Sequence, residues 1–98
     1  MATGLDQLLR AHREEILRIA ARHGAGNLRI FGSMARGEAG PDSDIDFLVE
    51  VQGPTSSWFP AGLMLDLEEL LGRRVEIVTE KALRPYLRDR VLAEAVPL

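Results

Sequence analysis

The chain has 98 residues, a net charge of −3 at neutral pH and no cysteine. This length predicts one domain spanning residues 1–98, and the lack of cysteine excludes disulfides, thiolate metal sites and cysteine nucleophiles. The mildly acidic charge argues against direct nucleic-acid binding, which usually shows as a basic patch. No apolar run approaches the roughly 20 residues that span a bilayer, and no signal-peptide pattern is present. We therefore expect a soluble cytoplasmic protein with no membrane partner.

The first half of the chain predicts a helix followed by two strands. Apolar residues recur at helical spacing over residues 5–21, and Gly24 and Gly26 should end this helix. Residues 27–31 are partly β-branched and predict a strand. A loop rich in glycine then leads to a second strand over residues 45–51, largely buried after its first positions.

The second half predicts a helix over residues 58–71, with Pro60 in its first turn, and a strand over residues 75–79. A last helix over residues 81–96 is interrupted or begun near Pro85. This order of elements predicts an α/β (α+β) fold, a sheet of about three to four strands with helices packed on it. The apolar residues near the C-terminus either complete the core or face another protein: Val91, Leu92, Val96 and Leu98.

Two carboxylates begin the second strand. Side chains alternate along a strand, so Asp44 and Asp46 point to the same face. Such a pair repels and raises its own pKa values unless a cation lies between the two groups. Magnesium suits this arrangement, because it binds one or two carboxylates together with substrate phosphates and waters.

A phosphate site is predicted beside the carboxylates. Gly32 and Ser33 lie where the first strand gives way to a short predicted helix, with Ser33 at or near its N-cap. Free backbone N–H groups and the helix dipole at such a turn favour a phosphate. A phosphate site facing a metal site indicates phosphoryl or nucleotidyl transfer.

The spacing of these residues resembles a known signature. Gly32-Ser33, ten residues and Asp44-Ile45-Asp46 are similar to the G-S-x10-D-x-D pattern of DNA polymerase β-type nucleotidyltransferases. The longer segment GSMARGEAGPDSDIDFLV resembles the minimal nucleotidyltransferase (MNT) branch, and the likeness extends through RRVEIVTEKAL to nearly the whole chain. The resemblance implies a small mixed sheet of the nucleotidyltransferase type. Many members of this branch are antitoxin partners of HEPN-domain toxins.

The resemblance also implies roles for individual residues. Gly32 and Ser33 would hold the nucleotide phosphates, and Arg36 would face them. Asp44 and Asp46 would bind two magnesium ions.

The third carboxylate of the family lies on a following strand, where this chain has Glu76. Family members often have aspartate at that place, and glutamate is one methylene longer. Each assignment has an alternative. Glu76 could be an outward-pointing strand residue, Arg36 an ordinary surface arginine, and DSDID a solvated acidic turn.

The reaction implied by the resemblance is transfer of AMP from ATP to a tyrosine hydroxyl of a cognate HEPN ribonuclease toxin, with release of pyrophosphate. The protein would then be the antitoxin of a hetero-oligomeric pair. One alternative is an antitoxin that acts by contact alone, with weak or no catalysis. Another is transfer to a small molecule such as an aminoglycoside, or to a nucleic-acid end, for which so short a chain would need a partner. The sequence leaves the acceptor, the base preference and the oligomeric state open.

Overall fold

The computed structural model describes residues 4–40, 42–55 and 57–98. Its helices and strands build one mixed sheet with the strand order β3-β2-β1-β4. β1 is antiparallel to both β2 and β4, whereas β2 and β3 are parallel. The predicted mixed α/β fold is therefore confirmed. In chain order the elements are α1 (Gly4–Ala11), α2 (Arg13–Arg22), β1 (Ala25–Phe31), β2 (Ile45–Val51), α3 (Ala61–Leu71), β3 (Val75–Thr79), the 3₁₀ turn η1 (Glu80–Ala82), α4 (Pro85–Glu94) and β4 (Val96–Pro97).

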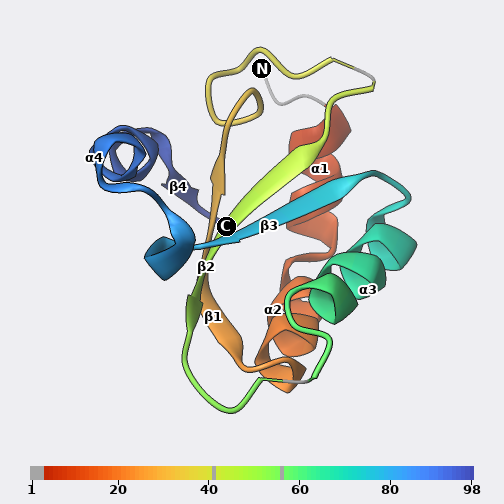
Figure 1. Cartoon of the computed structure of the whole chain (residues 1–98). Helices are drawn as coiled ribbons and strands as arrows, with labels where there is room; N and C mark the ends of the chain where they lie inside the picture. Colours follow the sequence, from red (N-terminus) through yellow and green to blue (C-terminus); the bar gives the residue numbers. More distant parts are fainter. Residues whose placement is uncertain (1–3, 41, 56) are drawn as a thin grey trace.

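The core lies between the sheet and the helices α1, α2 and α3. Figure 1 shows these three helices on one side of the strands and α4 away from them. Alternate residues of β2 point into this core, and Ile45, Phe47 and Val49 are fully buried there. The intervening residues of β2 therefore belong to the other face of the sheet, where Leu48 is also fully buried. Within the described residues, no helix is both long and apolar enough to cross a membrane.

The predicted first helix is in fact two helices. His12 has φ −109° and ψ 12°, outside the helical region, and it separates α1 from α2. Leu9 before the break and Ile16 after it are both in the core. No glycine or proline marks the break, so the apolar periodicity alone predicted one continuous helix.

The first strand begins earlier than predicted. α2 ends at Arg22, and Gly24 has φ +80°, but Gly26 lies inside β1 rather than in the turn after the helix. The pairing of β1 with β2 is irregular between Gly26 and Arg29, and Asn27 has φ +46° there. Gly26 thus belongs to a β-bulge, where a glycine is common.

The C-terminal helix is also shorter than predicted. It ends at Glu94, and Val96–Pro97 form a short strand against Arg29 and Ile30 of β1. Leu98 packs against the core, whereas Val96 is 45% exposed. The apolar end of the chain therefore both completes the core and remains partly exposed. α3 likewise begins at Ala61, three residues later than predicted, and Trp58 before it is 76% exposed.

Candidate active site

The site lies on the face of the sheet opposite α1, α2 and α3, at the first residues of β2. Asp46 is paired with Phe31 of β1 on one side and with Glu76 of β3 on the other. Residues paired across neighbouring strands share a face, so the Asp46 and Glu76 carboxyl groups lie side by side. The structure therefore brings together the second and third predicted carboxylates.

Ionisation of the Asp46 carboxyl group is unfavourable in this environment. Burial raises its pKa first, followed by a side-chain hydrogen bond with Glu76 and the negative charges of Glu76 and Asp44, to about 6. The positive charge of Arg36 acts in the opposite direction. Asp44, Glu76 and Arg36 thus all lie close enough to Asp46 to influence its ionisation.

Asp44 is exposed and lies just before β2. The chain is positioned there by the residues that precede β3, since Ile45 N–H donates to the carbonyl of Arg74 at 2.9 Å. Arg73 Nη2 donates to the carbonyl of Ser43 at 2.7 Å. Arg73 thus ties the loop before the aspartates to the turn that follows α3.

Gly32 lies directly against Asp46. Its φ is +77°, and a Cβ atom at this position would collide with the Asp46 carboxylate. Any other residue would therefore be strained in its backbone and would also displace Asp46. This contact explains why glycine is required here, and it places the predicted phosphate site beside the predicted metal site.

The predicted helix after Ser33 is wrong. The segment Gly32–Gly37 forms successive turns, in which Arg36 N–H donates to the carbonyl of Gly32 at 3.2 Å and Glu38 N–H to that of Ser33 at 2.8 Å. Gly37 has φ +74°, which stops a helix within one turn. Ser33 is half-buried at the start of this turn. A helix dipole therefore does not contribute, and the anion-binding groups are local N–H donors and Arg36.

One acidic residue at this place was missed by sequence reasoning. Glu94, the last residue of α4, accepts from Gly32 N–H through Oε2 and from Arg36 Nη1 through Oε1, both at 2.8 Å. Arg36 Nε also donates to Glu38 at 3.0 Å. No local pattern connects Glu94 with a glycine 62 residues away in the sequence, so only the fold reveals the contact.

The carboxylates fit a magnesium ion only in combination with another ligand. Among the described residues, no three Asp, Glu, His or Cys side chains converge so as to hold a metal ion by themselves. Magnesium, however, characteristically takes one or two carboxylates and fills its other positions with phosphate oxygens and waters. The oxygen donors and the raised pKa of Asp46 suit a cation that arrives together with phosphates.

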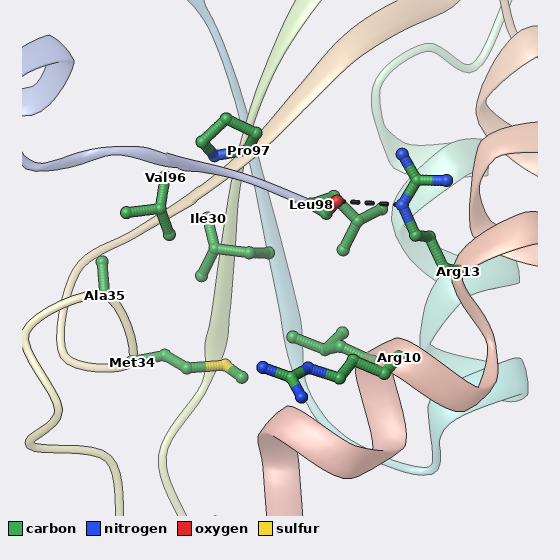
Figure 2. A pocket seen from close by; sticks show the side chains of 9 residues that line it. Arg10, Arg13, Ile30, Met34, Ala35, Val96, Pro97 and Leu98 are labelled. Atoms are coloured by element: carbon green, nitrogen blue, oxygen red, sulfur yellow. Dashed lines mark hydrogen bonds between the residues drawn. The ribbon is translucent and has the colours of Figure 1, made fainter. Parts of the chain in front are cut away.

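A cavity of about 430 Å³ lies elsewhere, between α1, β4 and the turn after β1. Figure 2 shows Ile30 and Val96 in this cavity, with Arg10 and Arg13 pointing toward it from the helices. Arg13 Nε donates there to the carbonyl of Leu98 at 3.0 Å. None of the six predicted site residues lines it, and since Ile30 is a core residue, it opens on the helix-covered face of the sheet.

Comparison with known proteins shows the family to which the chain belongs. Residues 9–98 match the family described as nucleotidyltransferase domain. A protein of Methanocaldococcus jannaschii that is named as a protein adenylyltransferase is 42% identical over 84 residues, which cover 86% of this chain and 90% of that protein. The protein adenylyltransferase MntA of Thermococcus cleftensis is 37% identical over 92 residues, covering 94% of this chain and 90% of that protein.

Solved structures show the same fold. One described as a minimal nucleotidyltransferase has a TM-score of 0.82 at 53% identity, with 94% of each chain covered. A toxin–antitoxin structure with AMP-PNP has a TM-score of 0.72 at 20% identity, covering 86% of this chain and 69% of that one. At that level of identity the second likeness concerns the fold alone.

The raised pKa of Asp46 predicts a pH dependence of stability without metal. Because the folded protein holds this proton more tightly than the unfolded chain, the free energy of unfolding should fall as the pH rises from about 4 through about 6. Asp46→Asn removes this effect and should be more stable than the wild type by about 1 kcal/mol at pH 7.5, since solvent screens a half-buried group. Urea unfolding of both proteins across this pH range measures the difference.

Glu69→Gln is the matched control, because Glu69 is exposed on α3, away from the site. Its difference from the wild type should be flat over the same pH range. A stability difference between Asp46→Asn and the wild type that is independent of pH would contradict the prediction.

Proposed function

Since this chain belongs to the nucleotidyltransferase domain family, we propose that it transfers AMP from ATP to a tyrosine hydroxyl of a cognate HEPN ribonuclease toxin and so acts as its antitoxin. The proposal rests on one observation: groups that bind an anion lie next to groups that favour a cation. Gly32 N–H and Arg36 bind an anion, and immediately beside them Asp46 and Glu76 form a pair that favours a cation. A magnesium–nucleotide complex supplies both charges.

The turn after β1 is the proposed binding place of the nucleotide phosphates. Gly32 offers a backbone N–H and Arg36 a guanidinium, and both already bind a carboxylate in the free protein. A guanidinium group binds phosphate oxygens in the same bidentate way as it binds carboxylate oxygens. Ser33 follows Gly32 in the turn, and we assign it to the same phosphates.

Asp44, Asp46 and Glu76 are the proposed ligands of two magnesium ions. When bound, the metal supplies Lewis-acid polarisation of the phosphoryl group and of the attacking hydroxyl. The part of the protein is to hold the carboxylates in place: Asp46 and Glu76 through the pairing of β2 with β3, and Asp44 through the loop that Arg73 ties down.

The proposed reaction forms a bond between the tyrosine oxygen of the acceptor and the α-phosphorus of ATP. The bond from the α-phosphorus to the oxygen bridging to the β-phosphate breaks, pyrophosphate leaves with that electron pair, and the hydroxyl proton passes to solvent. Positioning and electrostatics dominate the catalysis of such transfers. Gly32 and Arg36 would orient the phosphates, and the three carboxylates would hold the metal ions.

Similarity to named proteins and exposed apolar side chains support a protein acceptor. The relatives described above are named as protein adenylyltransferases, and the chain shares its fold with a solved toxin–antitoxin structure. Tyr86 and Leu87 of α4 are 72% and 38% exposed. Apolar side chains that are exposed together on one element are typical of a surface that binds another protein.

An antitoxin that acts by contact alone is the alternative. It is favoured by Glu76, whose longer side chain places the third carboxylate differently from an aspartate, and by the exposed apolar residues of α4. In that case the carboxylates would be a retained but weak site, and toxin neutralisation would not depend on them.

One prediction of the proposed function concerns nucleotide binding. Calorimetry should show ATP binding that strengthens with magnesium and weakens at least about tenfold in Asp44→Asn, a loss typical even of indirect metal contacts. Because Asp44 is exposed, the variant should keep its stability or gain some through reduced repulsion. Asp42→Asn, which removes an exposed charge from the same loop, is the control and should bind as the wild type does. Equal ATP affinity with and without magnesium would argue against the carboxylate site.

The second prediction concerns the toxin. Co-expressed with a cognate HEPN protein, the wild type should co-purify with it and add one or more AMP masses to a tyrosine, as mass spectrometry measures. Asp44→Asn should still co-purify but add no mass, while Asp42→Asn should behave as the wild type. If the wild type adds no mass and Asp44→Asn neutralises the toxin completely, the contact-only alternative is correct.

The third prediction separates binding from transfer. Glu76→Gln keeps the size of the side chain and removes its charge, so it should leave ATP binding nearly unchanged. Transfer should fall at least roughly a hundredfold, as expected for the loss of a key electrostatic contact in catalysis. Glu50→Gln, an exposed position farther along β2, is the control. Unchanged transfer in Glu76→Gln would mean that two carboxylates suffice or that the third ligand is another residue.

A further inference from the structure

The carboxylate of Glu94 occupies the groups that we assign to the nucleotide phosphates. Its two oxygens accept from Gly32 N–H and from Arg36 Nη1, both at 2.8 Å, and its side chain is 20% exposed. The hydrogen bond from Arg36, followed by that from Gly32, lowers the pKa of Glu94. Glu94 is therefore an anion at neutral pH when it accepts hydrogen bonds from Gly32 and Arg36.

One backbone hydrogen cannot serve two acceptors at full strength. The N–H of Gly32 points at Glu94, so a phosphate oxygen that uses this donor has to replace the carboxylate. Arg36 is committed in the same way, with Nη1 on Glu94 and Nε on Glu38. The free protein thus has an internal anion on its phosphate-binding donors.

We propose that Glu94 is a built-in competitor of the nucleotide, which holds the Gly32 and Arg36 donors in the free protein and leaves them when the phosphates bind. This inference rests on the proposed function, because the competing ligand is the triphosphate. It adds a regulatory residue outside the G-S-x10-D-x-D signature. It also makes the position of α4 dependent on whether nucleotide is bound.

The packing of α4 allows such a displacement. None of its side chains is fully buried, and Tyr86 and Leu87 are 72% and 38% exposed. The end of the helix is held instead by the pairing of β4 with β1 and by the two bonds of Glu94. Glu94 can therefore leave by a change of its own side chain or by a tilt of the helix, without opening the core.

The test compares the affinity of the whole chain for magnesium–ATP, and for inorganic tripolyphosphate without metal, in the wild type and in Glu94→Gln. Loss of the charge weakens the competitor, and we expect both ligands to bind about tenfold more tightly, the scale of one charge-assisted hydrogen bond. Glu94→Asp keeps the charge and shortens the reach, so it should also bind more tightly. Hydrogen exchange of residues 85–94 should speed up when ATP binds the wild type and change less in Glu94→Gln.

Glu38→Gln is the matched control. Glu38 also pairs with Arg36 but makes no bond to Gly32, and its side chain is 64% exposed. Its affinity should stay within about twofold of the wild type, the small effect of an exposed ion pair.

Unchanged or weaker binding in both Glu94 variants would overturn the inference, and weaker binding would make Glu94 a residue that positions Arg36. An equal gain in Glu38→Gln would also overturn it, by showing a general effect of charge. If wild type and variants all fail to bind ATP and tripolyphosphate, the proposed function fails, and the inference fails with it. Binding in the wild type without a gain in Glu94→Gln or Glu94→Asp rejects the inference alone.

Discussion

The register of β2 is the constraint on which the site depends. Ile45, Phe47 and Val49 are fully buried on the helix-covered face, so the alternation of the strand puts Asp46 on the other face. A shift by one residue would exchange the two sets of side chains and bury a carboxylate in an apolar core. Pairing with β1 and β3 on both sides then sets the neighbours of Asp46 to Phe31 and Glu76. The hydrophobic core thus positions the chemistry of the site.

This positioning has an electrostatic cost. Asp46 is partly buried beside Glu76 and near Asp44, and its raised pKa shows that the anion is disfavoured without a cation. The apolar burial along the rest of β2 stabilises the strand enough to hold the unfavourable group. A local conflict of this kind, within a fold that is otherwise consistent with its sequence, is typical of a functional site. The conflict is relieved by a cation, which is what the proposed function brings to it.

The sequence predicted most features that depend on neighbouring residues and missed those that depend on distant ones. The strands over residues 45–51 and 75–79 followed from local composition, and the face of the sheet on which Asp46 lies followed from strand alternation. No glycine or proline marks the break at His12, and the segment after Gly32 is too short to form the predicted helix. The pairing of Val96 with Ile30 and the contact of Glu94 with Gly32 join segments more than 60 residues apart. Tertiary packing alone decides such contacts.

The two halves of the site have opposite requirements, and the free protein satisfies only one of them. Glu94 supplies an anion to Gly32 and Arg36, whereas no cation offsets the neighbouring carboxyl groups of Asp46 and Glu76, and the pKa of Asp46 is raised. Arg36 connects the halves, since it binds Glu94 and its charge also lowers the pKa of Asp46. A ligand that brought only an anion would replace Glu94 on Gly32 and Arg36 with little gain in binding free energy. A metal alone would lack the phosphate oxygens that complete its coordination. The site therefore selects a ligand that carries both, and this is the physical reason for expecting the metal and the nucleotide to bind together.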